Sequence, residues 1–124
     1  MIRALLVAAL SLAALPLQAQ QVQEATTTGT GAVLRGLDKI NGNVVDIDIQ
    51  NGGVARMGGL VIRMRECRYP EGNQAGDAFA FLTVTEPEKT DDTVFEGWMM
   101  ASAPALNAMD HARYDIWVLR CKSS

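Results

Sequence analysis

"VVDIDIQNGGVARMGGLVIRMREC" (residues 44–67) is the stretch that decides the fold. In its first part, Val45, Ile47 and Ile49 alternate with two aspartates. Successive side chains of an extended chain point to opposite faces, so this period of two predicts a half-buried β-strand. The apolar residues would face a core and the aspartates would face water.

Glycine-rich turns divide the rest of this stretch. "NGG" at 51–53 ends the first strand, and Gly58-Gly59 separates the β-rich runs 54–57 and 60–67. Two glycines between such runs are typical of a two-residue hairpin, whose turn requires a positive φ angle. The sequence therefore predicts consecutive antiparallel strands at this point.

Similar apolar runs, separated by turn-forming residues, continue on both sides. The segments expected to be extended are 32–38, 44–49, 54–57, 60–67, 78–86, 93–100 and 114–121. Residues 101–113 are rich in alanine, leucine and methionine, which predicts a short helical segment capped by Ser102, with Pro104 in its first turn. The pattern predicts an all-β protein, either a small antiparallel sandwich or a partly open barrel, with this helical segment before the last strand.

The N-terminus has the order of a secretory signal peptide. Arg3 precedes an apolar run at 4–15, and the segment ends at the small residue Ala19. A membrane anchor is the alternative, but the run is shorter than the roughly 20 residues that span a bilayer. We expect a signal peptide at 1–19, a flexible polar leader at 20–31, a single β-rich domain at 32–122, and a periplasmic location.

The charge balance limits the partners. Loss of the signal peptide removes Arg3 and leaves 10 basic residues against the 14 acidic ones. A mildly acidic chain is not typical of proteins that bind nucleic acid or anionic lipid. No later run is long and apolar enough to cross a membrane, so we expect a protein that is not integral to the membrane after cleavage.

The two cysteines, Cys67 and Cys121, each lie at the end of a predicted strand. In an oxidising compartment, an even pair of cysteines predicts a structural disulfide. Their separation is too large for the Cys-x-x-Cys motif of redox enzymes.

His111, the only histidine, is the centre of the catalytic alternatives. With Ser102 and either Asp110 or Asp115 it has the residue types of a hydrolytic triad, and with the same aspartates it has some of those of a metal site. The simpler interpretation is that His111 hydrogen-bonds backbone groups in the loop before the last strand. We assign no catalytic residue, metal or cofactor, and keep an enzyme centred on His111 as an alternative.

The large side chains of the same region admit two interpretations. Trp98, Met99, Met100, Met109 and Trp117 suit core packing, but they also suit an interaction surface. A third class of function is a small-ligand-binding β-domain whose pocket is lined by the aromatic residues Phe79, Phe81, Trp98 or Trp117.

Several motifs of this region occur together in one order: Gly97-Trp98-Met99, Ser102–Leu106, His111 and Tyr114–Val118. In these motifs the chain resembles, from Ala32 to Lys122, a bacterial and mainly alphaproteobacterial exported family catalogued as domain of unknown function 2155. The family also has two cysteines at matching places. The resemblance implies export and no established activity, and the family's gene neighbourhood implies a respiratory complex as one candidate partner. We expect a non-catalytic protein-binding, accessory or assembly component of a cell-envelope complex.

Overall fold

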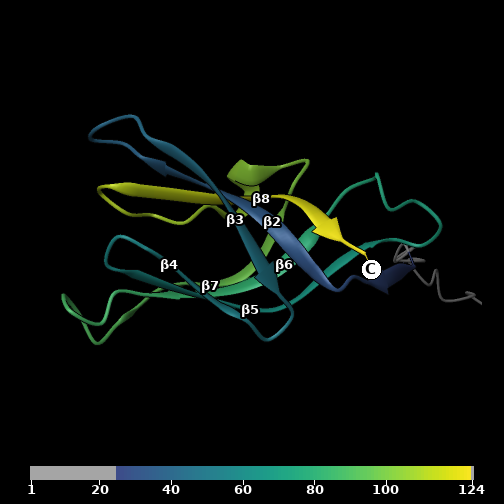
Figure 1. The fold of residues 1–124 in the computed structure, drawn as a ribbon, viewed down its shortest axis with the longest axis horizontal. Coiled ribbons are helices and arrows are strands. Elements are labelled where there is room, and N and C mark those ends of the chain that lie inside the picture. Colours follow the sequence, from purple (N-terminus) through teal and green to yellow (C-terminus); the bar gives the residue numbers. More distant parts are fainter. Residues whose placement is uncertain (1–24, 124) are drawn as a thin grey trace, which may run out of the picture.

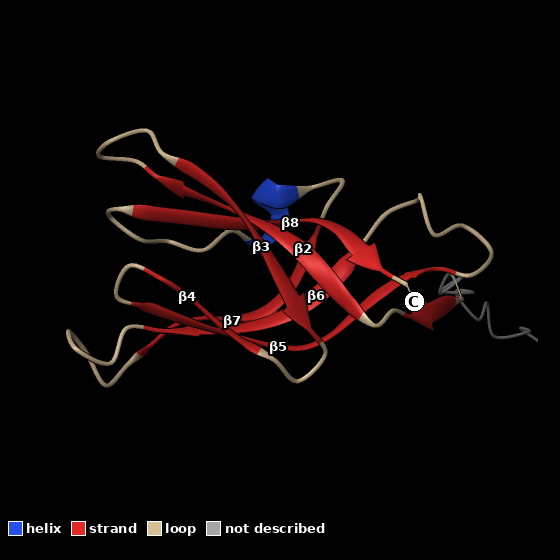
Figure 2. Cartoon of the chain, in the orientation of Figure 1, coloured by secondary structure: helices blue, strands red, loops and turns tan. Residues whose placement is uncertain are grey.

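The computed structural model describes residues 25–123, which form two antiparallel β-sheets packed as layers, with one short 3-10 turn (Figure 1). Strands dominate the described chain, and the turn is its single helical element (Figure 2). The predicted all-β class is confirmed, as an open sandwich rather than a closed barrel. The elements are β1 (Thr26–Thr28), β2 (Gly31–Asp38), β3 (Val44–Gln50), β4 (Val54–Met57), β5 (Leu60–Pro70), β6 (Phe79–Thr85), β7 (Thr93–Met100), η1 (Pro104–Asn107) and β8 (Tyr114–Lys122).

The two sheets differ in size. The small sheet has the order β3-β2-β8, and the large sheet has the order β1-β5-β6-β7. Strand β4 also pairs with β5, at the start of β5, whereas β1 pairs with its end. Because β6 occupies the other edge of β5, β1 and β4 lie one after the other along the same edge.

The hairpin expected at Gly58-Gly59 forms between β4 and β5. Met57 pairs with Leu60, and Gly58 has a φ angle of 56°. The hydroxyl group of Tyr114, from the small sheet, lies against Gly58 and leaves no room for a side chain there. This turn is therefore a point where the two sheets touch closely.

The core lies between the sheets and is built from the inward-facing residue of each alternating pair. In β6, for example, Ala80, Leu82 and Val84 are fully buried, while the residues between them are partly exposed. Each large apolar side chain removed from water contributes about 1.5–3 kcal/mol to folding. The largest fully buried side chains are Leu34, Leu60, Ile62, Met64, Leu82, Val84, Ile116, Val118 and Cys67.

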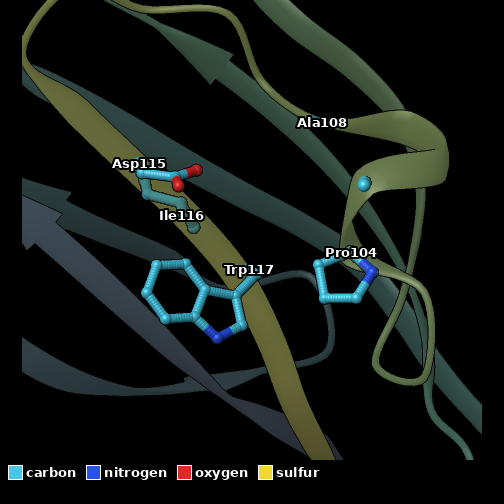
Figure 3. Close-up of a pocket in the computed structure, with 6 residues that line it drawn as sticks. Pro104, Ala108, Asp115, Ile116 and Trp117 are labelled. Atoms are coloured by element: carbon cyan, nitrogen blue, oxygen red, sulfur yellow. The ribbon is translucent and has the colours of Figure 1, made fainter.

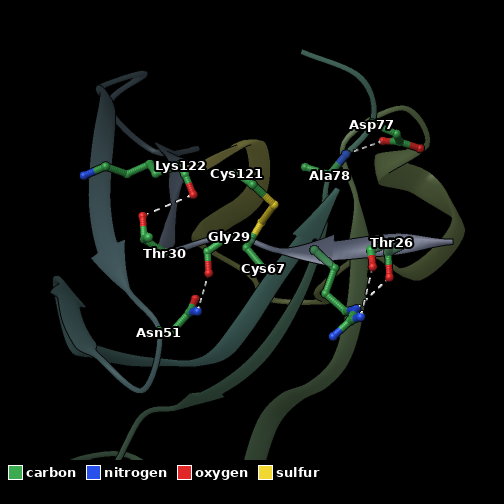
Figure 4. The surroundings of a disulfide bond; sticks show 10 residues. Thr26, Gly29, Thr30, Asn51, Cys67, Asp77, Ala78, Cys121 and Lys122 are labelled. Atoms are coloured by element: carbon green, nitrogen blue, oxygen red, sulfur yellow. Dashed lines mark hydrogen bonds between the residues drawn. A yellow bond between two sulfur atoms is a disulfide. The ribbon is translucent and has the colours of Figure 1, made fainter. Parts of the chain in front are cut away.

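A disulfide bond between Cys67 of β5 and Cys121 of β8 joins the two sheets at the end of the sandwich near the C-terminus (Figures 1 and 4). The Cα atoms of the two cysteines are 5.6 Å apart and lie 54 positions apart in the sequence. The bond is the one that the even pair of cysteines predicts.

The chain crosses from the large sheet to the small sheet beside this disulfide. The amide of Gly29 donates to the carbonyl of Cys67 (2.8 Å), and the amide of Thr30 donates to the carbonyl of Lys122 (2.7 Å). The Asn51 side-chain amide donates to the carbonyl of Gly29 at 2.6 Å (Figure 4). A Cβ atom at position 29 would lie 2.6 Å from the carbonyl oxygen of Lys122, so this crossing requires glycine.

Strand β1 lies in the segment expected to be a flexible leader. Arg68 holds it, because its guanidinium donates to the hydroxyls of Thr26 (2.7 Å) and Thr28 (2.8 Å). Strand pairing thus begins ahead of the boundary expected at Ala32. The expected signal peptide and the first part of the leader lie outside the described residues.

We predict that replacing both cysteines by alanine lowers the free energy of unfolding by about 4 kcal/mol, because the loop of 54 residues is no longer closed in the unfolded chain. Urea denaturation of the double variant and of the wild type, both under oxidising conditions, measures the difference. Wild type under a reductant should match the variant. Equal midpoints for oxidised wild type and variant would contradict the prediction.

Candidate functional site

The segment between β7 and β8 is held by Asp77, which the sequence patterns did not single out. The Ser102 hydroxyl donates to Asp77 Oδ2 at 2.5 Å, and the Ser102 amide donates to Oδ1 at 2.9 Å. The N-cap residue of η1 is Ala103, and no side chain makes a capping hydrogen bond there. The expectation that Ser102 caps a helix is therefore wrong, because its hydroxyl is bound to the Asp77 carboxylate instead.

His111 is almost buried and uses both ring nitrogens. Its Nδ1 accepts hydrogen bonds from the amides of Arg113 and Tyr114, both at 3.0 Å, so this nitrogen carries no proton. Its Nε2–H then donates to Glu86 Oε1 at 3.0 Å. His111 precedes β8 of the small sheet and Glu86 follows β6 of the large sheet. The bond therefore links the two sheets, and the histidine satisfies backbone groups as the simpler interpretation predicted.

The residues of the candidate triad bond elsewhere. The hydrogen bonds of Ser102 go to Asp77 and those of His111 go to Glu86, so the two side chains do not form the nucleophile–base pair that a triad requires. Asp110 and Asp115 make no side-chain hydrogen bond within residues 25–123. Over the same range, no three histidine, cysteine or acidic side chains are grouped in a way that could hold a metal ion.

Asp38 supports the loop that carries His111. Its buried carboxylate accepts from Arg113 Nη2 at 2.9 Å and Nε at 3.1 Å, and its other oxygen accepts from the amide of Ile40 at 3.0 Å. The hydrogen bonds from Arg113 are the largest cause that lowers the pKa of Asp38 below its ordinary value. This pair ties the β2–β3 turn to the start of β8.

The five residues proposed as an interaction surface do not form one surface. Met99 and Met109 are buried in the core, whereas Trp98 and Met100 belong to the outer face of the large sheet. Trp117 pairs with Arg35 and lies on the outer face of the small sheet. Alternation along β7 separates Met99 from its two neighbours, and the sandwich separates the two tryptophans.

The outer face of the large sheet combines aromatic residues with arginines, which come from separate strands. Cross-strand partners share a face, and Arg68 is paired with Phe79, which is paired with Met100. In the next row, the Phe81 and Trp98 rings meet edge to face at 5.4 Å. We call this surface the arginine–aromatic face, defined by Arg56, Arg63, Arg65, Arg68, Phe79, Phe81, Trp98 and Met100.

A β-bulge in β5 places one of these arginines. The register with β6 shifts between Met64 and Cys67, so that Arg65 and Glu66 both lie opposite Phe81. The Arg65 guanidinium carbon lies 4.0 Å from the centre of the Phe81 ring, within the range of a cation–π contact. The bulge thus presents Arg65 above the aromatic row.

The basic residues of the two outer faces differ in how many have acidic partners. On the small sheet, Arg35 pairs with Asp46 at 2.8 Å and Lys122 pairs with Asp48 at 3.2 Å. The pKa of Asp46 is lowered mainly by the hydrogen bond from Arg35 and also by the charge of Arg120, which makes no ion pair among the described residues. On the large sheet, three arginine side chains make no hydrogen bond or ion pair to any residue between 25 and 123; they belong to Arg56, Arg63 and Arg65. Cations without internal partners are available to bind an anionic group.

The surface has several hollows, and the tryptophans line different ones. A hollow of about 250 Å³ on the arginine–aromatic face is lined by Thr26, Arg68, Phe79, Trp98 and Met100. Another, of about 340 Å³, lies between β8 and η1, where Trp117 faces Pro104 (Figure 3). Trp98 and Trp117 therefore do not line a common pocket with the two phenylalanines, as the ligand-binding alternative allowed.

These features define a small two-layer β-sandwich joined by one disulfide. The chain belongs to the family described as "Uncharacterized protein conserved in bacteria (DUF2155)", whose model matches residues 32–121. It is similar to the uncharacterized protein RP359 of Rickettsia prowazekii, with 26% identity over 94 residues, covering 74% of this chain and 61% of that relative. No solved structure matches significantly. Among the described residues, no helix has the length and apolar character needed to cross a membrane.

We predict that His111→Ala lowers the free energy of unfolding by about 1–3 kcal/mol, because two backbone amides and Glu86 lose their partner. His111→Asn should lose less, since its side-chain oxygen can still accept from the amides. Urea denaturation of both variants tests this. An alanine variant as stable as the wild type would contradict the bonding role.

We also predict a pH dependence from Asp38. Because its pKa is lowered in the folded protein, its contribution to stability is present above the unfolded aspartate pKa of about 3.9 and is lost as the pH falls through the lower, folded value. Asp38→Asn should be less stable than wild type at neutral pH, and the difference should shrink in acid. Denaturation series between neutral pH and about pH 2 measure this difference in stability.

Asp91→Asn, in the exposed β6–β7 turn, controls for the loss of one negative charge. A difference that does not change with pH would contradict the prediction.

Proposed function

We propose that this protein is a non-catalytic periplasmic component that binds another cell-envelope protein through its arginine–aromatic face. The observation that carries the proposal is the contrast between the two outer faces. On the small sheet, Arg35 and Lys122 have acidic partners and Arg120 lies near Asp46, whereas on the large sheet three arginine side chains have no hydrogen-bond or ion-pair partner among the described residues. They lie beside the exposed Trp98 and partly exposed phenylalanine and methionine side chains.

The composition of the face is that of a protein interface. Trp98 is 38% exposed although it is among the largest apolar residues of the chain. Trp98 and Met100 both line the hollow on this face. Tryptophan, methionine and arginine are enriched where proteins bind each other, and tryptophan and arginine often carry much of the binding energy. The face therefore combines an apolar part, around the hollow, with a basic part along β4 and β5.

The periplasmic location rests on two supports. Residues 1–19 have the pattern of a secretory signal peptide, and the Cys67–Cys121 disulfide belongs to a class of bond that persists in oxidising compartments. The family resemblance adds a respiratory complex of the envelope as one candidate partner.

The hollow on this face favours a protein partner over a small ligand. Its volume of about 250 Å³ is below the roughly 300–1,000 Å³ typical of pockets that enclose a ligand. A hollow of this size suits one large side chain of a partner, with the surrounding sheet face forming the rest of the contact.

Site-specific photo-cross-linking tests this proposal in the organism's own envelope. The full-length chain, with its own N-terminus, carries a photoreactive phenylalanine analogue in place of Trp98. The matched control carries it at Val44, which is 56% exposed on the small sheet. We expect one discrete adduct with a single envelope protein from position 98 and none from position 44. Recovery of the monomer alone from both positions would contradict the proposal.

A further inference from the structure

We infer that the arginine–aromatic face binds an extended acidic segment of the partner, with carboxylates at alternate positions followed by a large apolar side chain. This inference rests on the proposed function, since it names the chemistry of the partner at the same face. It is carried by the positions of three arginine side chains that have no partner within residues 25–123, and by the apolar hollow beyond them.

The arginines lie on successive rows of the sheet. Arg56 is paired with Val61 in one row, Arg63 is paired with Thr83 in the next, and Arg65 lies over Phe81 in the third. Rows on one face are two residues apart along a strand, which corresponds to about 7 Å. Alternate side chains of an extended polypeptide have the same repeat, so successive carboxylates can each meet one guanidinium.

The apolar part of the face follows in the same direction. Beyond Arg65, the next row contains Arg68, Phe79 and Met100, which line the hollow together with Trp98 and Thr26. A leucine- or phenylalanine-sized side chain, placed after the carboxylates of the ligand, would enter this hollow. The order of charges and apolar surface along β5 therefore sets the order of residues in the ligand.

Two carboxylates on the same face favour a protein segment over a polyanion. Glu96 is paired with Thr83, in the row of Arg63, and Glu66 lies 3.6 Å from Arg68. The whole chain also has a net charge of −3. A lipid surface or a phosphate backbone carries negative charge at every repeat, so some of its charges would lie against these carboxylates and be repelled. A protein segment can place neutral residues opposite them.

The bulge in β5 is the local feature that makes the arrangement possible. If this sequence continued to alternate regularly past Arg65, with no bulge, Cys67 would lie on the outer face and Arg68 on the inner one. With it, Cys67 points to Cys121 and Arg68 joins the outer face. The bulge thus allows both the disulfide and the series of arginines that continues along β5.

Fluorescence anisotropy with a labelled peptide tests the inference on the mature protein. The probe is a blocked peptide that alternates glutamate with serine and ends in leucine, and the control probe has glutamine in place of glutamate. We expect the acidic probe to bind and the glutamine probe not to bind. We also expect binding to weaken between low salt and about 0.15 M salt, because exposed ion pairs are screened.

Variants locate the site. Arg63→Gln with Arg65→Gln should weaken binding by about tenfold or more, which is the combined effect of losing two exposed arginine–carboxylate contacts. Arg120→Gln is the matched control, because Arg120 is also exposed and lacks an ion pair among the described residues, but lies on the small sheet. It should bind as wild type does. Equal thermal unfolding midpoints show that the variants are folded.

Three results would overturn the inference. The first is that wild type fails to bind the acidic probe, and the second is that the Arg63/Arg65 variant binds it as well as the Arg120 variant does. The third is that wild type binds vesicles containing about one-third phosphatidylglycerol but not the peptide, which would assign the face to a membrane surface. If cross-linking from position 98 still gives its adduct in these cases, only the acidic-segment chemistry fails. If that adduct is absent, the proposed function itself fails.

Discussion

The closed end of the sandwich, where Cys67 is bonded to Cys121, is the constraint on which the rest of the structure depends. Gly29 passes between the sheets at this point with no space for a side chain, and it is hydrogen-bonded to the Cys67 carbonyl. The crossing fixes where β1 ends and where β2 begins. Because β1 then lies beside the end of β5, it forms one wall of the hollow on the large sheet. A covalent bond between the layers thus also shapes the surface outside them.

The other end of the sandwich is held without a covalent bond. His111 reaches from the small sheet to Glu86 of the large sheet, and Arg113 beside it is held by Asp38. His111, Glu86 and Asp38 are largely buried, and each has a hydrogen-bond partner, which is the condition for burying such groups without loss of stability. With both ends fixed from within, neither outer face is needed to hold the sheets together. The two faces are therefore free to differ in charge and in function.

Local patterns account for most of the fold, and long-range pairing accounts for what they miss. The alternation at Val45–Ile49, the Gly58-Gly59 turn and the even pair of cysteines predict strands, a hairpin and a disulfide that the structure contains. The bond between His111 and Glu86 joins residues that no local pattern connects, and the same is true of Ser102 and Asp77. The arginine–aromatic face depends on the register between β5, β6 and β7 and on a bulge, which sequence periodicity does not reveal. The sequence predicts in part which tryptophan and methionine residues face the core, since a period of two along β7 separates Met99 from Trp98 and Met100.

The fold gives least explanation for the arginines whose side chains have no partner in the described part of the chain. An exposed ion pair adds only about 0–1 kcal/mol to stability, and an exposed arginine without a partner adds less. Arg63 and Arg65 therefore contribute little to folding, and the cation–π contact of Arg65 with Phe81 fixes the position of the guanidinium without neutralising its charge. Arg68 is different, because its guanidinium holds β1 through the two threonine hydroxyls. Changes at Arg63 and Arg65 thus test the proposed binding without altering the fold, whereas a change at Arg68 would also release β1.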